Sequence, residues 1–380
     1  MTNTHRNRVD ILDYARFFAA LLVMSFHYFY GGIKAGLMPT VPFSGMWSSI
    51  FQFGYVGVSL FFMISGYVIF YSAQGRTAAQ FATARALRLY PAFVAALLMT
   101  TCFVYLFGSD KEAISPLRFI QNLSMLATDL GGEYVDPSYW TLRLEILFYG
   151  MVCLIILVGA AAHLEHFFLI WPLFILVAQF TPLSTLPLLS CDFAYFAAGA
   201  LFSMRRTKAG WAPVALIILC YLESLYGAGI FTDDFGTRNK VVLPILTLFY
   251  LFFALLNKPA ILQMELPAAR FVGALTYPVY LVHQVIGCIV IRNFQTDDNR
   301  VVLILTVMGS MLFFAYVLHR VVEINGRALA KHVIDRLLGA PISWAENTLQ
   351  ARGNKKAIGT DPLISNDVLV EPVQAQRFPS

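Results

Sequence analysis

The sequence is poor in charge, and its few cysteines follow no recognisable spacing. Charged residues make up 13% of the 380 residues, whereas an ordinary soluble domain carries about 25%. The five cysteines fall within apolar stretches without a Cys-x-x-Cys pair, so we expect neither a metal site nor a disulfide framework. No basic tract is interleaved with aromatic residues, which argues against nucleic acid as a partner. Hydrophobic residues make up 58% of the chain, and this excess indicates an integral membrane protein.

Apolar stretches recur along the chain with short polar breaks between them. Most are long enough to cross about 30 Å of hydrocarbon, or nearly so once interfacial aromatic residues are counted. The pattern predicts an all-α, polytopic membrane protein with about ten transmembrane helices. The predicted spans lie at about 11–31, 50–72, 89–107, 139–160, 167–180, 188–204, 211–226, 241–256, 271–292 and 301–319.

The distribution of lysine and arginine predicts the orientation of these spans. With the amino terminus placed in the cytoplasm, eighteen of the 27 basic residues fall on the cytoplasmic side and seven on the opposite side. Arg16 and Arg143 lie inside predicted spans, and Arg292, the last residue of the ninth span, is counted with the opposite side. Because cytoplasmic loops carry the excess of positive charge, the bias predicts that both termini are cytoplasmic. Part of the excess comes from the carboxyl-terminal tail, and without that tail the split is ten to seven.

The chain divides into four predicted regions. Residues 1–10 form a cytoplasmic segment, and residues 11–319 form the transmembrane domain. Basic and apolar residues alternate over 320–350, which suits an amphipathic helix on the anionic cytoplasmic leaflet. Residues 351–380 are rich in Asn, Gln, Gly and Pro, which predicts a disordered tail. The outward loop at 108–138 is long enough to cover a site that opens away from the cytoplasm.

The first predicted span carries an arginine and a histidine. Arg16 and His27 are eleven residues apart, which is about three helical turns plus 20°, so both project from one helix face. Asp13 lies within about 60° of Arg16 on that face. An ionisable residue near mid-membrane costs roughly 2.5–3.5 kcal/mol on insertion scales and usually faces a protein interior or a wet cavity. The span therefore predicts a functional site within the membrane.

Arg85 and Arg88 form an Arg-x-x-Arg pair in the predicted cytoplasmic connection before the third span, and Arg76 adds a third charge nearby. Guanidinium groups bind phosphates through two parallel hydrogen bonds, so this cluster is suited to a phosphorylated ligand. Arginines also flank spans on this side for reasons of topology. Taken alone, the three arginines favour the topological interpretation.

The fourth predicted span opens with Trp140 and Thr141. Glu145 lies about one turn further on the same face and enters the hydrocarbon, whereas Arg143 points about 200° away and can reach the outer interface. Glu145 therefore needs a partner from another span, for which the arginine and the histidine of the first span are candidates, or it binds a substrate group. A structural ion pair between helices is an equally good interpretation.

The ninth predicted span places Tyr280 and a second imidazole, His283, in an otherwise apolar helix that also contains Pro278. His283 could line the same cavity as His27, or it could satisfy a backbone group freed by the proline. In the second span, Ser65 and Gly66 form a small step that allows another helix to approach closely.

In their order and spacing over residues 11–320, these segments resemble the acyltransferase-3 family of bacterial membrane acyltransferases. The matching pieces are Leu12-Asp13-x-x-Arg16 with His27, Phe61-Phe62-x-x-Ser65-Gly66-Tyr67, Arg85-x-x-Arg88-x-Tyr90-Pro91, Trp140-Thr141-Leu142-x-x-Glu145-x-x-Phe148-Tyr149, Tyr195-Phe196-Ala197-Ala198-Gly199 and Tyr280-Leu281-x-His283-Gln284. Arg143 departs from the family pattern, which usually has a small polar residue there.

The resemblance implies an O-acyltransferase of the bacterial cytoplasmic (inner) membrane. It would move an acyl group, most often acetyl, from cytoplasmic acyl-coenzyme A to a hydroxyl of a carbohydrate or glycolipid at the outer face. No resident metal is expected. Direct transfer and an acyl-histidine intermediate both stay open, as do the acyl chain length and the identity of the acceptor.

With this resemblance, the candidate residues receive roles. His27 is predicted as the general base, Arg16 as the group that stabilises charge on the donor or sets the state of His27, and Asp13 as its orienting partner. Glu145 would orient the acceptor or His27. Coenzyme A phosphates are assigned to Arg85, Arg88 and Arg76, and the acceptor to Trp140, Thr141, Tyr280 and His283.

Two other classes of protein fit part of this pattern. A proton-coupled transporter or flippase would use the intramembrane charges as a path, although the sequence shows no internal repeat of the kind many transporters have. A scaffold would use the buried charges only to hold helices together.

Overall fold

The computed structural model describes residues 9–38, 46–109, 112–206, 210–231, 237–296 and 299–359, and within these ranges it contains helices and no strands. The predicted all-α class is therefore confirmed for this part of the chain. Residues 1–8 of the predicted amino-terminal segment and residues 360–380 of the predicted tail lie outside the described residues.

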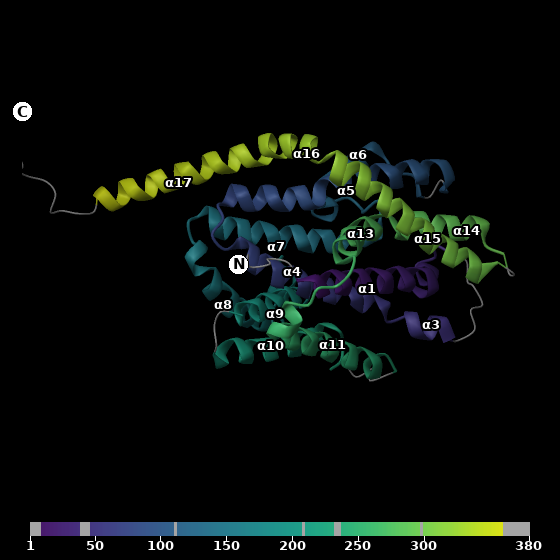
Figure 1. The fold of residues 1–380 in the computed structure, drawn as a ribbon, viewed down its shortest axis with the longest axis horizontal. Coiled ribbons are helices and arrows are strands. Elements are labelled where there is room, and N and C mark those ends of the chain that lie inside the picture. Colours follow the sequence, from purple (N-terminus) through teal and green to yellow (C-terminus); the bar gives the residue numbers. More distant parts are fainter. Residues whose placement is uncertain are drawn as a thin grey trace, which may run out of the picture.

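Six helical segments in the described ranges are long and apolar enough to cross a membrane. They are Asp10–Lys34, Trp47–Ala73, Ala78–Phe107, Pro137–Leu157, Ala161–Ala178 and Arg300–Asn325. Their main helices are α1 (Asp10–Phe26), α4 (Gly57–Ala73), α5 (Ala78–Phe107), α7 (Trp140–Leu157), α8 (Leu164–Ala178) and α15 (Arg300–Leu318). Figure 1 shows α1, α4, α5 and α7 lying lengthwise in one bundle.

The other four predicted spans take different forms. Helices α13 (Ala269–Val282) and α14 (Gln284–Phe294) pass the same test only as a pair bent by 63°, which would make a seventh span. The remaining stretches form helices α9 (Asp192–Met204), α10 (Trp211–Gly227) and α11 (Thr237–Leu256), which are shorter or have a shorter apolar part. The number of ten spans and the orientation of both termini therefore stay predictions.

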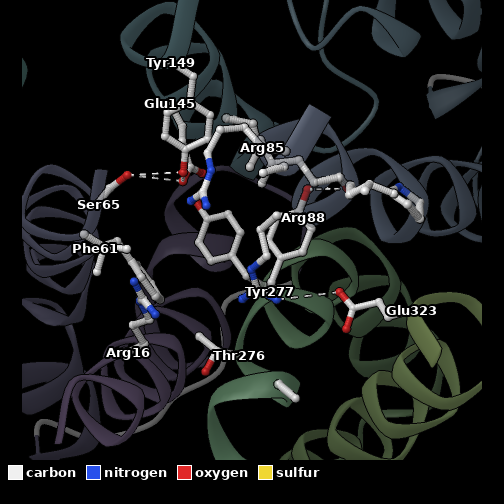
Figure 2. Close-up of a pocket in the computed structure, with 18 of the residues that line it drawn as sticks. Arg16, Phe61, Ser65, Arg85, Arg88, Glu145, Tyr149, Thr276, Tyr277 and Glu323 are labelled. Carbon is white, nitrogen blue, oxygen red and sulfur yellow. Dashed lines mark hydrogen bonds and ion pairs between the residues drawn. The ribbon is translucent and has the colours of Figure 1, made fainter. Parts of the chain in front are cut away.

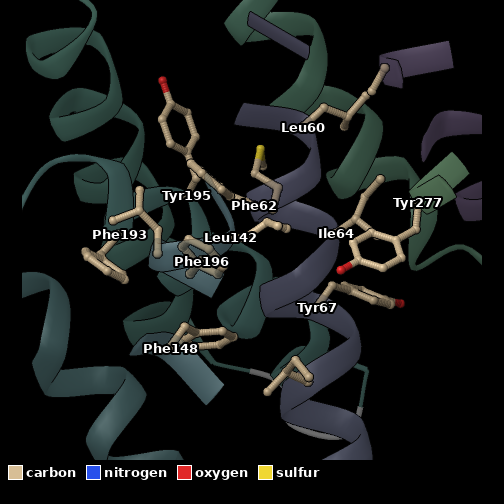
Figure 3. Close-up of a cluster of buried hydrophobic side chains, with 14 of the residues drawn as sticks. Leu60, Phe62, Ile64, Tyr67, Leu142, Phe148, Phe193, Tyr195, Phe196 and Tyr277 are labelled. Carbon is tan, nitrogen blue, oxygen red and sulfur yellow. The ribbon is translucent and has the colours of Figure 1, made fainter. Parts of the chain in front are cut away.

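Helix α9 is short because it lies inside the protein. Every residue from Phe193 to Met204 is buried, and the helix packs against α4, α8 and α10. Its tightest crossing uses two glycines. A Cβ atom on Gly66 of α4 would lie 2.0 Å from the Phe196 carbonyl oxygen, and one on Gly199 would lie 2.0 Å from the Met63 carbonyl oxygen. Aromatic rings fill the space beside this crossing, with Phe62 stacked on Phe196 (Figure 3). The small step predicted at Ser65 and Gly66 is thus confirmed.

Replacing Gly66 by alanine is expected to destabilise the protein, because the new methyl group meets backbone that cannot move aside. Overpacking of this kind typically costs about 1–3 kcal/mol. Gly150→Ala is the matched control, since a Cβ there meets nothing within 4 Å. Thermal unfolding in detergent should show a lower midpoint for Gly66→Ala and no loss for Gly150→Ala. Equal midpoints for the two variants would contradict this account of the crossing.

The bend between α13 and α14 is held by side chains that satisfy the opened backbone. His283 Nδ1 lies 2.8 Å from the Tyr280 carbonyl oxygen, and Tyr28 donates to the His283 carbonyl oxygen at 2.5 Å. On the far side of the break, the Val285 backbone N–H donates to Asp136 at 3.1 Å. Because these three backbone groups have side-chain partners, the bend is a fixed feature that orients His283.

A folded cap covers the end of the bundle where α5 ends and α7 begins. It contains α6 (Pro116–Leu123), and bidentate ion pairs join it to the bundle: Arg292 with Glu112 at 2.9 and 3.0 Å, and Arg143 with Asp129 at 2.6 and 2.6 Å. The hydrogen bonds from Arg143 lower the pKa of Asp129. Partial burial raises the pKa of Glu112, but the hydrogen bonds from Arg292 and Ser109 outweigh burial and bring that pKa below its ordinary value. Both carboxylates are therefore ionised at neutral pH.

The chain after α15 continues as helix along the bundle. It forms η8 (His319–Asn325), α16 (Arg327–Ile334), η9 (Asp335–Gly339) and α17 (Ala340–Gly359), which runs past the edge of the bundle in Figure 1. Residues 351–359 of the predicted tail are part of α17. The segments η8, α16, η9 and α17 all pack on α5, and the Ala78 backbone N–H donates to Glu346 at 3.2 Å. Residues 320–350 therefore contact α5 on one side, whereas apolar side chains such as Leu329, Leu337 and Trp344 are exposed, and the position on the lipid surface stays a prediction.

Candidate functional site

A cavity of about 660 Å³ lies between α1, α4, α5, α7 and α13, and residues of η8 and α16 close one side (Figure 2). One end of this cavity lies at the level where helices α1, α5 and α13 begin and helix α4 ends. We call this the arginine end, because Arg76, Arg85, Arg88 and Arg327 line the cavity there. From this end the cavity extends as far as Thr141 and Tyr280.

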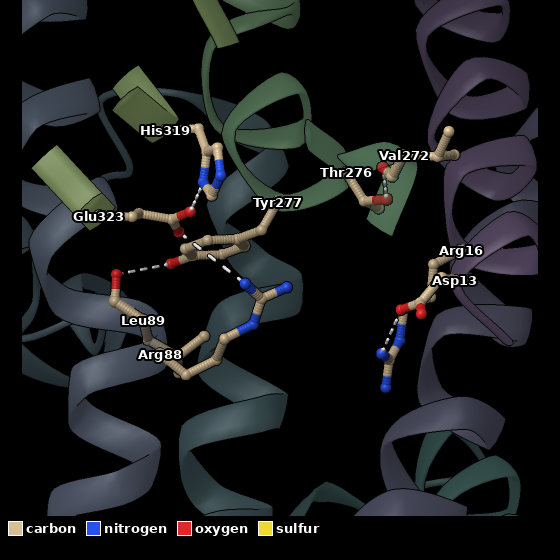
Figure 4. Close-up of polar contacts among 9 residues, drawn as sticks. All are labelled: Asp13, Arg16, Arg88, Leu89, Val272, Thr276, Tyr277, His319 and Glu323. Atoms are coloured by element: carbon tan, nitrogen blue, oxygen red, sulfur yellow. Dashed lines mark hydrogen bonds and ion pairs between the residues drawn. The ribbon is translucent and has the colours of Figure 1, made fainter. Parts of the chain in front are cut away.

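Arg16 lines the cavity from α1 and is held by a carboxylate of the same helix. Its Nη1 atom lies 3.7 Å from Oδ1 of Asp13, as the i, i+3 spacing predicts (Figure 4). Asp13 is pressed against α13, where a Cβ on Gly273 would lie 2.5 Å from Oδ1. Because Gly273 has no side chain, α13 packs directly against the Asp13 carboxylate and holds it beside Arg16.

Arg88 and Arg85 project from one face of α5 into the cavity. Arg88 lies 3.8 Å from Glu323 of η8, and its guanidinium group sits over the Tyr277 ring at 5.7 Å. Glu323 also contacts His319, with Nδ1 and Oε2 2.6 Å apart. Arg85 lies over the rings of Phe81 and Tyr149 at 6.0 Å each, and its buried Nε atom has no hydrogen-bond partner. Among the described residues Arg85 forms no ion pair, so it is available to an anionic ligand.

Glu145 lies in the cavity wall and is held by hydroxyl groups. Tyr149, one turn further along α7, donates to its carboxylate, and Ser65 of α4 donates at 3.4 Å. Arg16 and His27 were the candidate partners from another span, but neither forms an ion pair with Glu145 in the described part of the chain. The partner from another span is instead the Ser65 hydroxyl of α4, and the alternative role of Glu145 in binding a substrate group stays a prediction.

Replacing Glu145 by glutamine is expected to lower the rate of the acyl transfer that the sequence predicts by about 10- to 100-fold, the equivalent of one charge-assisted hydrogen bond at roughly 1.5–3 kcal/mol. The change keeps the shape of the side chain and removes its charge. Glu165→Gln on α8, outside the cavity lining, is the matched control. The measurement is thioester-dependent release of free thiol by purified protein. A Glu145→Gln variant as fast as the control would limit Glu145 to a structural role.

The two histidines lie together, beyond the end of the cavity. The ring centroids of His27 and His283 are 5.2 Å apart, and Tyr280 lies 5.5 Å from His283 on the cavity side. The carbonyl oxygen of Tyr280 can only accept, so Nδ1 of His283 carries a proton in that hydrogen bond. Two ring nitrogens are then buried without a partner, Nε2 of His283 and Nδ1 of His27. A neutral His283 presents its Nε2 lone pair as a proton acceptor.

Most of the predicted site residues lie close to one another in the structure, but they do not all line the same cavity. Arg16, Arg76, Arg85, Arg88, Glu145, Thr141 and Tyr280 line the cavity. The lining includes neither His27 nor His283, so the shared hollow predicted for Arg16 and His27 is not present as one cavity. Trp140 is 42% exposed at the start of α7 and packs edge-on against Phe62. Thr141 and Tyr280 share a hydrogen bond of 2.7 Å and separate the cavity from the two histidines.

Sequence reasoning did not single out several residues of the cavity. Tyr149 follows Glu145 by four residues, which is a signal for contact on a helix. Glu323 and His319 show the same spacing, but they fall at the edge of the region interpreted as an amphipathic surface helix. Arg327 belongs to that region as well.

Comparison with known proteins identifies the family. The family model described as an acyltransferase domain matches residues 9–320. The chain belongs to the acyltransferase-3 family. It is also 31% identical over 164 residues to Nodulation protein 10 of Rhizobium leguminosarum bv. viciae, a match that covers 38% of this chain and 42% of that protein. No solved structure matches.

The family match in this acyltransferase covers almost all of the described transmembrane helices and every predicted site residue. It ends at residue 320, whereas the cavity lining continues through Glu323 and Arg327 to Ala330. Except for His319, the lining residues of η8 and α16 therefore lie beyond the part that the family model describes.

Proposed function

We propose that this acyltransferase moves an acyl group, most often acetyl, from acyl-coenzyme A to a hydroxyl of a carbohydrate or glycolipid across a bacterial cytoplasmic membrane. In this proposal the arginine end faces the cytoplasm and the cap faces outward. The observation that supports it best is the cavity that runs from the arginine end to the Thr141 and Tyr280 hydroxyls, with the His27 and His283 pair directly behind them.

The charge of the cavity suits a donor that carries several phosphates. Five arginines line it, against the two carboxylates Glu145 and Glu323. Guanidinium groups bind phosphate oxygens bidentately and, in a site shielded from water, more strongly than at an open surface. Arg85 and Arg88 would hold donor phosphates with Arg76, and the acyl end would extend toward Thr141 and Tyr280.

In the proposed reaction, the general base and the donor phosphates lie on opposite sides of the acyl group. The acceptor hydroxyl would approach from the cap end, beside Trp140, and give its proton to His27 as its oxygen attacks the thioester carbonyl. The new carbon–oxygen bond forms, the carbon–sulfur bond breaks, and the coenzyme A thiolate leaves and takes up a proton. Arg16, oriented by Asp13, lies in the donor cavity, which favours a role on the donor over one on His27.

The test uses membranes that contain the protein, acetyl-coenzyme A labelled in the acetyl group, and a candidate glycan. Acyl transfer predicts release of free coenzyme A thiol together with labelled glycan, and mass spectrometry of surface glycans from cells with and without the protein identifies the acceptor. A transporter or flippase would move solute without consuming thioester. A scaffold would do neither, and its charge variants would change only stability.

A further inference from the structure

A second cavity, of about 670 Å³, adjoins the first at the arginine end. Arg16, Arg76 and Arg88 line both cavities, so the two spaces meet along these three side chains. The second cavity adds two arginines that lie outside the family-like motifs of the sequence. Arg206 follows the end of α9, and Arg270 lies in the first turn of α13.

Arg206 and Arg270 differ from the arginines shared by the two cavities in their charge partners. Arg16 lies near Asp13, and Arg88 lies near Glu323. Arg206 and Arg270, by contrast, form no ion pair with any residue that the structure describes. Five arginines line the second cavity against the single carboxylate of Asp13, and like charges gathered in a cleft raise the local potential and attract an anion.

The second cavity also offers contacts for an aromatic base. The end of α4 contributes Tyr67, Tyr71, Ser72 and Gln74 to its wall. The Arg206 guanidinium group lies over the Tyr71 ring at 5.1 Å, and Tyr71 is 39% exposed. An exposed tyrosine ring and a guanidinium plane both stack on nucleobases, and the amide of Gln74 can bond a base edge.

We propose that the second cavity binds the nucleotide end of the donor, an adenosine that carries phosphate groups, while the acyl-bearing arm lies in the first cavity. This inference rests on the proposed function. Arg16, Arg76 and Arg88 meet the phosphates that link the two halves, at the line where the cavities join. Arg206 and Arg270 bind the phosphate on the ribose, and Tyr71 stacks on the base. Each cavity falls within the range of about 300–1,000 Å³ that is usual for ligand pockets.

Three thioester donors of decreasing length test whether the nucleotide end binds in the second cavity. The wild type is compared with the double variant Arg206→Ala with Arg270→Ala, using acetyl-coenzyme A, its analogue without the ribose phosphate, and acetyl-4′-phosphopantetheine, which lacks the whole nucleotide. We expect the KM for acetyl-coenzyme A to rise about 10- to 100-fold in the double variant, the loss expected for charge-assisted contacts to phosphate. The KM for acetyl-4′-phosphopantetheine should not change, and kcat with either donor should stay close to wild type.

Two further variants control for folding and charge. Arg205→Ala removes the neighbouring exposed arginine, which lines neither cavity, and should behave as wild type. Arg206→Lys with Arg270→Lys keeps both charges and should retain most of the preference for the full-length donor. If the alanine variant discriminates among the three donors as the wild type does, the inference is wrong.

The same assay separates this inference from the proposed function. A wild type that uses none of the three thioesters overturns the proposed function itself. An anionic lipid headgroup could also bind two arginines at this end, so the assay is repeated in nanodiscs with and without phosphatidylglycerol. If the substitutions change only the response to that lipid and leave donor discrimination intact, the cavity binds headgroups and the inference fails.

Discussion

Replacing His27 by alanine is expected to lower transfer by about 10²- to 10⁴-fold, the usual contribution of a general base. The reason is geometric as well as chemical. His27 lies where α1 passes into a π-helical turn, and such turns are frequent at functional sites. It lies against His283, on the far side of Tyr280 from the donor cavity. The measurement is release of coenzyme A thiol with a saturating donor.

His163→Ala is the control for this variant, because His163 is an exposed histidine in the connection before α8 and lines neither cavity. Thermal unfolding of both variants shows whether the loss at His27 reflects misfolding. Full activity in a folded His27→Ala protein would remove the proposed base and leave His283, with its unpartnered Nε2, as the imidazole to examine.

Replacing both Arg85 and Arg88 by alanine is expected to raise the KM for acetyl-coenzyme A by about 100-fold or more. Each guanidinium contact to a phosphate contributes roughly 1.5–3 kcal/mol, and two contacts multiply their effects. Arg85 should contribute more, because Arg88 must first give up part of its contact with Glu323. The readouts are KM from initial rates and Kd from calorimetry with coenzyme A.

The double variant Arg85→Lys with Arg88→Lys is compared with the alanine variant, because lysine keeps the positive charge but cannot form the two parallel hydrogen bonds of a guanidinium group. We expect it to recover only part of the affinity. Lys258→Ala, outside both cavity linings, serves as the control for general loss of positive charge at this end. Unchanged donor affinity in the alanine variant would mean that the two arginines serve topology alone.

The sequence predicted local features of the site well where the spacing along one helix decides the contact. Asp13 and Arg16 are three residues apart, and the structure pairs them. Ser65 and Gly66 were expected to allow a close helix crossing, and α9 crosses α4 there. Both features follow from helical periodicity and side-chain size, which a single sequence contains.

Contacts between distant segments were predicted less well. A charge from the first span or a substrate group was expected to meet Glu145, and the protein partners that the structure shows are the hydroxyls of Tyr149 and Ser65. Arg143 was expected to point toward the outer interface, and the structure pairs it with Asp129 of the cap, a partner that the sequence did not indicate. Helical periodicity gives the direction in which a side chain points, but the identity of the neighbour depends on how helices and loops pack.

The number of spans shows a related difficulty. Hydropathy identifies apolar segments, but a helix buried among other helices is as apolar as one that faces lipid. The stretch at 188–204 is α9, which is surrounded by protein and only 13 residues long. The bend after Val282 likewise depends on Tyr28 and Asp136, which lie far from it in the sequence.

The helices that follow α15 complete the wall of the first cavity beyond residue 320, where the match to the family model ends. A protein that stopped at residue 320 would keep the whole matched domain but would lose Glu323 and Arg327, leaving one flank of the arginine-lined cavity open to water and Arg88 without its carboxylate. Relatives that differ in this segment can therefore differ in how tightly they hold a donor, even where their shared motifs are identical.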